Sequence, residues 1–232
     1  MKRLILLSLP LFLFSCRPWR YDVGPVITED RNLAPFTALS VYGEPDIVFT
    51  LDTGIVVRVE APEKLQDDIH TSVSNGRLRV EQTGWREWFN GKTKVYIAQT
   101  GFDDLYFSGS GKISGAPLIM NNGIIKHFGS GDLDLTISSP KLFIQLFGSG
   151  DLTLQGQIPS LELSTTGSGD INAEPVYAVK AIVNCTGSGD IRVRVSDTLQ
   201  VNISGSGDVR YWGNPSVLNV NITGSGDLIH MN

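Results

Sequence analysis

The amino-acid sequence predicts an all-β protein whose main part is a right-handed parallel β-helix, or β-solenoid. Two observations lead to this fold class. The tetrapeptide Gly-Ser-Gly-Asp recurs at a nearly constant spacing through the second half of the chain, and the residues between its copies alternate between apolar and polar. A fixed period of this size is typical of solenoids, and an alternation of period two indicates β-strands.

The repeat defines the coils. An altered first copy, Gly109-Ser110-Gly111-Lys112, precedes the exact ones, and the steps between copies are 20, 19, 19, 20, 18 and 19 residues. About 19 residues hold two short strands and two corners, so each strand should pair with its counterpart one coil on, about 4.8 Å away. The exact copies are Gly129–Asp132, Gly148–Asp151, Gly167–Asp170, Gly187–Asp190, Gly205–Asp208 and Gly224–Asp227.

Two sets of apolar columns predict the inward walls of the coils. One residue after each Asp, or after Lys112, stands an apolar side chain: Ile113, Leu133, Leu152, Ile171, Ile191, Val209 and Leu228. The strands before the corners supply the other wall, with Leu105, Phe107, Leu142, Ile144, Leu146, Leu161, Leu163, Ala181, Val183, Cys185, Leu199, Val201, Ile203, Leu218, Val220 and Ile222. Glycine suits the corners because a sharp turn requires backbone angles, often with φ > 0, that side chains forbid, and because identical corners stack closely. Right-handed winding follows from the usual hand of parallel crossovers.

Residues 1–16 resemble a bacterial export signal. Lys2 and Arg3 precede an apolar run too short for a membrane span, and Leu13-Phe14-Ser15-Cys16 resembles a lipobox, in which the cysteine becomes the lipidated first residue. Ordinary secretion, with Cys16 discarded, is the alternative. Residues 17–30 are expected to be a flexible tether. Residues 31–232 are expected to form one domain, with an N-terminal β-rich section over 31–104 and regular coils over 105–232.

The N-terminal section has its own local signals. Strands are predicted over residues 39–41, 46–51, 55–60, 78–81 and 94–97. Ser74-Asn75-Gly76-Arg77 predicts a hairpin turn, and Pro62–His70 is the one candidate for a helical turn. Trp85, Trp88 and Phe89 lie in a glycine-bounded segment that interrupts the pattern. This segment either covers an end or side of the rod or forms an exposed aromatic platform for a sugar or a protein.

Composition and residue patterns argue against nucleic-acid binding and against a catalytic site. The chain has 19 Lys and Arg against 24 Asp and Glu, a net charge of −5, and no basic cluster, so nucleic-acid binding is not expected. Cys185 occupies an inward column and is expected to be a small buried hydrophobe. His70, His127 and His230 accompany no recurring carboxylate pattern, and there is no nucleophile motif, so no catalytic residue is assigned and no cofactor is expected.

The order of motifs resembles one bacterial family. Phe36-Thr37-Ala38-Leu39-Ser40-Val41, Asp46-Ile47-Val48, Val73-Ser74-Asn75-Gly76-Arg77-Leu78 and Leu105 running into Gly109-Ser110-Gly111 match the family of "putative auto-transporter adhesins, head GIN domain", which is common in Bacteroidetes. The resemblance covers about seven eighths of the chain. It implies a right-handed β-helical fold, a lipoprotein or secreted location, and no established biochemical activity; fold does not fix function.

The aspartates of the repeat form the first candidate site. They would stack at about 4.8 Å intervals, and like charges opposite one another in a sheet are destabilising. Local capping, with each carboxylate accepting hydrogen bonds from corner N–H groups or Ser hydroxyls, is the simpler explanation. The weaker alternative is a calcium ladder, since each corner offers only one Asp and one Ser. The residues concerned are Asp132, Asp151, Asp170, Asp190, Asp208 and Asp227.

Outward columns form the other candidates. A polar ladder stands three residues before each corner: Lys126, Gln145, Ser164, Asn184, Asn202 and Asn221. Phe128 and Phe147 occupy the outward place just before the corner in adjacent coils, and Ile124 and Phe143 the outward place four residues earlier. These four side chains either form an exposed apolar patch of the kind that marks an interface, or are covered by the N-terminal segment or a loop.

These observations favour a non-catalytic cell-envelope lipoprotein. It would be held at the outer membrane through its N-terminal lipid, facing the periplasm or the cell surface, and would serve as an adhesion or binding scaffold for a glycan or protein ligand. A polysaccharide-active β-helix enzyme is one alternative. A structural or assembly component that acts as a homo-oligomer is the other.

Overall fold

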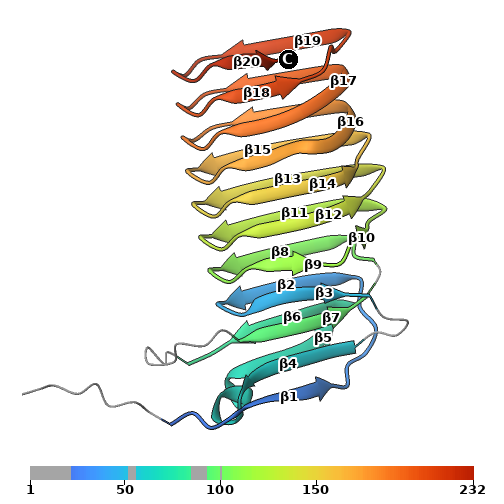
Figure 1. Ribbon diagram of the computed structural model, residues 1–232, viewed down its shortest axis with the longest axis vertical. Coiled ribbons are helices and arrows are strands. Elements are labelled where there is room, and N and C mark those ends of the chain that lie inside the picture. The colour runs from blue at the N-terminus through green and yellow to red at the C-terminus, as the bar shows by residue number, and fades with distance from the viewer. Residues whose placement is uncertain (1–21, 52–55, 85–92, 100) are drawn as a thin grey trace, which may run out of the picture.

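The computed structural model describes residues 22–51, 56–84, 93–99 and 101–232. Its twenty strands form one hydrogen-bonded sheet, which winds into an elongated solenoid with β1 near one end and β19 and β20 at the other (Figure 1). The all-β, solenoidal fold class predicted from the repeat is confirmed.

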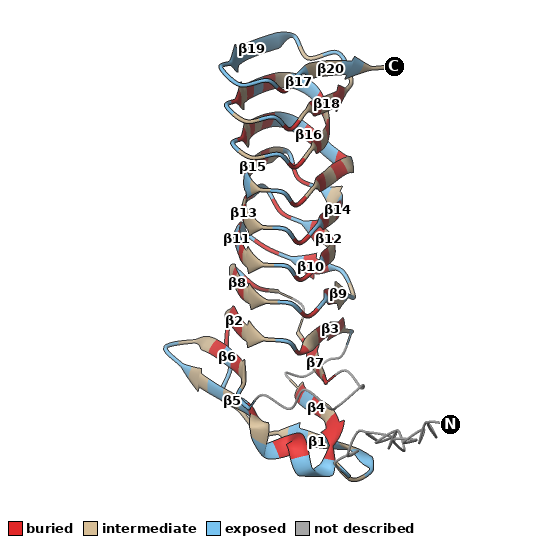
Figure 2. Cartoon of the chain, turned by 90° about the vertical axis from the view of Figure 1, so that its left-hand side faces the viewer, coloured by how far each residue is buried: buried red, intermediate tan, exposed pale blue. Residues whose placement is uncertain are grey.

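Two walls of strands face each other across the interior (Figure 2). The pre-corner wall, whose strands run into the corners, consists of β6 (Arg77–Gln82), β2 (Ala38–Gly43), β8 (Asp104–Gly109), β11 (Asn122–Gly129), β13 (Lys141–Gly148), β15 (Ser160–Gly167), the second halves of β16 (Ile171–Cys185) and β17 (Ile191–Ile203), and β19 (Val217–Ile222). The post-corner wall consists of β7 (Lys94–Ala98), β3 (Asp46–Thr50), β9 (Ile113–Gly115), β12 (Leu133–Ser138), β14 (Leu152–Gln157), the first halves of β16 and β17, β18 (Val209–Trp212) and β20 (Leu228–Met231). The short β10 (Leu118–Ile119) pairs with the end of β12.

Parallel pairing follows the register of the repeat. Leu142 pairs with Leu161, Leu161 with Ala181, and Ala181 with Leu199. The inward columns predicted for these coils are 0–2% exposed. Apolar area buried in this way is the main stabilising term of the rod, at about 25 cal/mol per Å².

The corners stack so closely that only glycine fits. A Cβ placed on Gly169 would lie 2.1 Å from the carbonyl oxygen of Gly150, one coil away. Positive φ is a lesser factor, since among the glycines of the Gly-Ser-Gly corners only Gly129 and Gly148 have φ in the left-handed half of the map, at +146° and +138°. The expectation that identical corners stack closely is confirmed, and close approach is the more general reason for glycine.

The N-terminal strands do not stack in chain order. Strand β2 lies between β6 and β8, parallel to both, and β3 lies between β7 and β9 in the same way. The coil built from residues 38–50 therefore fits between two coils that follow it in the sequence (Figure 1). Nothing in the repeat pattern predicts this order.

Antiparallel strands and a 3₁₀ helix close the N-terminal end. Strand β1 (Val26–Arg31) pairs with β4 (Val56–Pro62), and β4 pairs with β7, both antiparallel. Residues 26–30, expected to belong to the tether, are therefore part of a strand, because β4 offers them a hydrogen-bonding edge. The expected helical turn is present as η1 (Glu63–Asp68), where the buried Gln66 amide donates to the carbonyls of Ile27 (3.1 Å), Val59 (3.3 Å) and Ala61 (3.3 Å).

The predicted hairpin joins β5 (Ile69–Ser74) to β6. These strands are antiparallel, with Ser74 opposite Arg77. Asn75 and Gly76 between them have φ of 51° and 71°, the sign at both central positions that a type I′ turn requires.

The C-terminal coil leaves its inner side chains exposed. Leu218, Val220 and Ile222 of β19 are 43–45% exposed, although they continue columns that are buried in the preceding coil. Figure 2 shows β19 coloured as exposed along its length. The sequence places these residues in the correct inward columns, but their burial depends on a further layer.

Candidate functional site

The aspartate column caps the corners from coil to coil. In each pair, Oδ1 of one Asp accepts a hydrogen bond from the backbone N–H of the Asp in the next coil, at 2.8–3.1 Å. The capping hypothesis is confirmed, with the detail that the acceptor and donor belong to different coils. Asp46 caps the N–H of Lys112 in the same way at 2.8 Å, although its own corner, Gly43-Glu44-Pro45-Asp46, does not match the repeat. The capping pairs run through Asp132, Asp151, Asp170, Asp190, Asp208 and Asp227.

The charges of this column are partly neutralised near the C-terminal end. The Arg210 guanidinium lies 2.5 Å from Oδ2 of Asp190 and 3.1 Å from Oδ2 of Asp208. Burial raises the pKa of Asp190, but hydrogen bonds from Arg210 and from the backbone of Asp208 outweigh it and hold that pKa below its ordinary value. Within the described ranges, no group of three or more His, Cys, Asp or Glu is arranged to hold a metal ion.

The polar ladder of the pre-corner wall contains a hydrogen bond between neighbouring coils. Asn202 Nδ2 donates to Asn184 Oδ1 at 2.8 Å. In the next outward column, the hydroxyls of Ser204 and Thr186 lie 3.4 Å apart. The predicted ladder is confirmed for Asn184 and Asn202, and the Thr186–Ser204 contact lies beside it. Side chains of one kind are thereby held at the same place in successive coils.

The apolar outward residues form a stack of aromatic rings. The rings of Phe128 and Phe147 are 4.7 Å apart and 10° from parallel, and Tyr106 stacks on Phe128 at 5.4 Å. Tyr42 continues the stack with a 5.4 Å contact to Tyr106, and the Arg79 guanidinium lies 4.2 Å from the Tyr42 ring centre. We call these five side chains the aromatic stack.

The four apolar outward residues are less exposed than an open binding patch would be. Phe128 pairs with Phe147 and Ile124 with Phe143, as the column count predicted. The three phenylalanines are half-buried and Ile124 is 38% exposed. Because Tyr106 and Phe147 stack on the Phe128 ring, mainly the edge of that ring remains for a partner. The four residues make an apolar stripe more than an open platform.

Polar side chains also occur inside the rod, where they contact carbonyl oxygens of the corners. His127, Thr165 and Cys185 each contact the carbonyl oxygen of the glycine four residues later, at 2.6, 3.5 and 3.4 Å. Burial lowers the pKa of His127, although its contacts with the carbonyls of Phe107 and Gly131 act in the opposite direction. Burial raises the pKa of the Cys185 thiol. The interpretation of Cys185 as a small buried side chain is confirmed.

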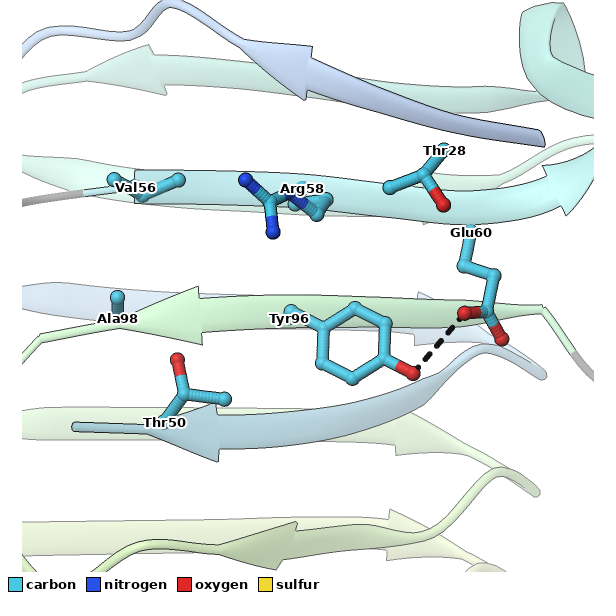
Figure 3. Close-up of a pocket in the computed structure, with 7 residues that line it drawn as sticks. All are labelled: Thr28, Thr50, Val56, Arg58, Glu60, Tyr96 and Ala98. Carbon is cyan, nitrogen blue, oxygen red and sulfur yellow. Dashed lines mark hydrogen bonds between the residues drawn. The ribbon is translucent and has the colours of Figure 1, made fainter. Parts of the chain in front are cut away.

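A pocket that the sequence did not predict lies near the N-terminal end of the rod. Its volume is ≈ 250 Å³, and it opens on the outer surface of β1, β4, β7 and β3 (Figure 3). A local signal existed, since Val56, Arg58 and Glu60 alternate with the buried Val57, Val59 and Ala61. The sequence does not predict the sheet order β1, β4, β7, β3, in which no two neighbouring strands are consecutive in the chain. The lining residues are Thr28, Thr50, Val56, Arg58, Glu60, Tyr96 and Ala98.

Other predicted sites lie elsewhere. Trp85, Trp88 and Phe89, as well as the lipidation candidate Cys16, lie outside the described residues. Of the remaining histidines, His70 is exposed on β5 and His230 stacks on Tyr211 at 4.6 Å. In the part of the chain that the structure describes, no helix is long and apolar enough to cross a bilayer.

Comparison with known families shows which family the chain belongs to. The model of the family described as "putative auto-transporter adhesin, head GIN domain" matches residues 35–215. The chain belongs to this family. The resemblance inferred from the order of motifs is thus confirmed, and a head GIN domain of this kind fits a cell-envelope or surface protein with an adhesin-like role.

Several solved structures share the fold of this chain. A "putative adhesin" from Bacteroides fragilis has a TM-score of 0.81 at 23% identity, over 89% of this chain and 97% of that one. A "putative lipid binding protein" from Parabacteroides distasonis has 0.73 at 24%, over 90% and 98%. A second Parabacteroides distasonis protein, again a "putative adhesin", has 0.71 at 19%, over 90% and 98%. At these identities the likeness concerns the fold. No curated protein matches the chain.

Proposed function

We propose that this protein is a non-catalytic lipoprotein of the cell envelope, attached to the outer membrane through lipid on Cys16, and that its rod is an adhesion or binding scaffold. The observation that carries the proposal is the hydrogen-bonded outward ladder of the pre-corner wall. Asn184 and Asn202 bind one another directly, and Thr186 and Ser204 continue the pattern beside them.

A ladder of this kind suits a ligand that repeats. Asn184, Asn202 and Asn221 present the same amide group in three successive coils, about 4.8 Å apart, so a polymer could make equivalent contacts at several coils. Contacts along the rod already hold the side chains in place, which lowers the entropy lost on binding. Several weak contacts on one chain then add to a useful avidity. The adhesin description of the family supports the same role.

The outer charges favour a scaffold over an enzyme. On the post-corner wall, the Arg194 guanidinium contacts the carboxylate of Glu174, and Arg210 bridges Asp190 and Asp208. The Arg194–Glu174 and Arg210–Asp190 contacts join neighbouring coils and so stabilise the stack. A hydrolase or lyase would instead need titratable groups that converge on one substrate bond.

An array experiment tests the scaffold role. The purified full chain would be applied to arrays of bacterial envelope polymers and host glycans, with and without calcium. Binding to a repetitive polymer is expected, and Asn202→Arg should weaken it at least tenfold. Thr153→Arg, an outward position on the opposite wall, is the matched control. The proposal fails if no polymer binds, or if both variants bind like the wild type.

The membrane anchor has a separate test. Cells that express the full chain would be labelled with an alkyne-bearing fatty acid, and the protein would be examined for the label. Incorporation is expected in the wild type and none in Cys16→Ser, which should be released into the soluble fraction. Unlabelled wild-type protein would support ordinary secretion instead.

Self-association is the second candidate, favoured by the exposed C-terminal coil. Leu218, Val220 and Ile222 are 43–45% exposed, whereas Leu199, Val201 and Ile203 in the preceding coil are 0–1% exposed. The strand edge of β19 carries no charged residue or proline, the devices that usually protect edges. The opposite end is closed by β1, β4 and η1. A second copy of the chain would therefore cover this coil, with the two C-terminal coils in an antiparallel, isologous contact.

Mass measurement in solution tests this candidate. The full chain should form a dimer, and Val220→Asp should convert it to a monomer by placing a charge in the contact. Phe147→Asp distinguishes the alternative contact, because only dimerisation through the aromatic stack would be lost in that variant. A wild type that is monomeric at about 100 μM would exclude this candidate.

A further inference from the structure

The pocket of Figure 3 has the lining of a small-molecule site. It spans four adjacent strands, in the order β1, β4, β7 and β3. Register places Glu60 opposite Thr28, Arg58 opposite Tyr96, and Ala98 opposite both Val56 and Thr50. Side chains from residues 28 to 98 thus meet on one outer surface, and the pocket volume is ≈ 250 Å³.

An aromatic ring lies among polar groups in this pocket. Tyr96 projects from β7. In Figure 3 its ring is seen face-on and its hydroxyl is directed at Glu60. Tyr96 Oη donates to Glu60 Oε2 at 3.2 Å, which fixes the orientation of both side chains. The hydroxyls of Thr28 and Thr50 and the guanidinium of Arg58 complete the polar part of the lining.

The charges around the pocket are compensated. The carboxylate of Glu60 has Lys94 at 3.6 Å, and Arg58 Nε binds Asp30 Oδ1 at 2.7 Å. An anion bound here would face Glu60, and a cation would face Arg58. The lining therefore favours a neutral ligand that can both donate and accept hydrogen bonds.

Size and polarity narrow the ligand further. Pockets for drug-sized ligands usually measure about 300–1,000 Å³, so ≈ 250 Å³ suits a single ring. A lipid chain would need a mostly apolar lining, whereas Val56, Ala98 and the Tyr96 ring here lie among the polar groups of Thr28, Thr50, Arg58 and Glu60. A neutral sugar ring meets both requirements, because its C–H face can pack on an aromatic ring while its hydroxyls bond to Thr, Glu and Arg.

We infer that this pocket binds one neutral sugar ring, stacked on Tyr96, as a terminal or side-branch residue of a glycan. The inference rests on the proposed binding role and gives that role a specific ligand class and contact point. Binding through one ring would be weak alone, and the outward ladder would add to it when the glycan is long. Neither the repeat nor the family description assigns this site.

Ligand-observed NMR with the purified full chain tests the inference. The probes are the methyl glycosides of glucose, galactose, mannose and N-acetylglucosamine, each titrated to 20 mM. At least one should show saturation transfer and a dissociation constant in the millimolar range. Tyr96→Ala should weaken that binding at least tenfold, because the packing surface is lost. Tyr96→Phe keeps the ring and should stay within about threefold.

Two further variants keep the result interpretable. Tyr106→Ala removes a half-buried outward tyrosine from the aromatic stack, outside the pocket, and should leave glycoside binding unchanged. Thr28→Arg places a long side chain at the exposed rim and should reduce binding even if Tyr96→Ala unfolds. Absence of glycoside binding in the wild type overturns the inference, as does binding that both Tyr96→Ala and Thr28→Arg leave intact.

The array experiment separates this inference from the proposed function. If long polymers bind the wild type and Tyr96→Ala equally, and Asn202→Arg abolishes that binding, the scaffold role stands and the sugar pocket is wrong. If neither polymers nor glycosides bind the wild type, both proposals fail.

Discussion

Asp170 Oδ1 lies 2.8 Å from the backbone nitrogen of Asp190, so that the carboxylate of one coil caps the corner of the next. An aspartate at a turn commonly accepts a hydrogen bond from its own turn. Here the bond runs between coils, and it recurs along the rod. The same residue type thus both satisfies a corner N–H group and fixes the distance between neighbouring coils.

Removing one of these caps should destabilise the rod. Asp170→Ala leaves the Asp190 N–H without its acceptor and should lower the free energy of unfolding by about 1–2 kcal/mol. Asp170→Asn keeps an Oδ1 acceptor and should lose less than half of that. Urea unfolding followed by circular dichroism measures both, with Ser168→Ala as the exposed control. Equal losses for the Asn and Ala variants would show that charge matters more than the acceptor.

Arg210 should control how acid affects the C-terminal coils. Hydrogen bonds from Arg210 and the Asp208 backbone hold the pKa of Asp190 below its ordinary value, against the opposing effect of burial. A lowered carboxyl pKa stabilises the fold above the unfolded-state pKa, near 3.8, and that stability is lost as pH falls through the folded-state value.

Arg210→Gln is expected to lower stability at pH 7 and to reduce the further loss between pH 4 and pH 2. Urea midpoints over this range measure the effect. Arg194→Gln, which removes a contact with Glu174 instead, should leave the part of the acid profile that comes from Asp190 unchanged. An identical profile for wild type and Arg210→Gln would contradict the assignment.

His127 should make the rod sensitive to mild acid. Burial lowers the pKa of this imidazole, so the folded state favours the neutral form. The resulting stability is present above the unfolded-state pKa of 6.5 and is lost as pH falls below it. We expect the wild type to be less stable at pH 5.5 than at pH 8, by about 1 kcal/mol.

Substitution by leucine tests the role of His127. Leucine is the residue in the next rung, Leu146, which pairs directly with position 127. His127→Leu should remove most of the difference in urea midpoint between pH 8 and pH 5.5. His70→Gln, at an exposed position on β5, should keep it. If the leucine variant retains the full difference, another group is responsible.

The corner glycines should tolerate no side chain. Gly169→Ala would place a Cβ 2.1 Å from the Gly150 carbonyl oxygen and should cost about 3 kcal/mol by forcing the coils apart. Gly76→Ala is the matched comparison, because nothing lies within 4 Å of its Cβ and only φ of +71° opposes the change. It should cost about 1 kcal/mol. Chemical unfolding gives both values; comparable losses would mean that corner stacking is looser than described.

The sequence determined the fold because the solenoid repeats its own local rules. The Gly-Ser-Gly-Asp period sets which residues pair, so Leu142, Leu161 and Ala181 fall into one buried column without any knowledge of the tertiary structure. Alternation sets which side chains point outward, and this placed Phe128 beside Phe147 and Asn184 beside Asn202. The hairpin at Asn75-Gly76 was equally local.

Only the tertiary structure decided what lies outside the period. Strand β2 lies between β6 and β8, and β1 pairs with β4 across 26 or more residues. These are non-local pairings that no alternation encodes. These pairings bring Thr28, Arg58 and Tyr96 to one surface and so create the pocket. The exposure of Leu218 also depends on the tertiary structure. The sequence places this residue in an inward column, but its burial requires a further layer of strands next to it.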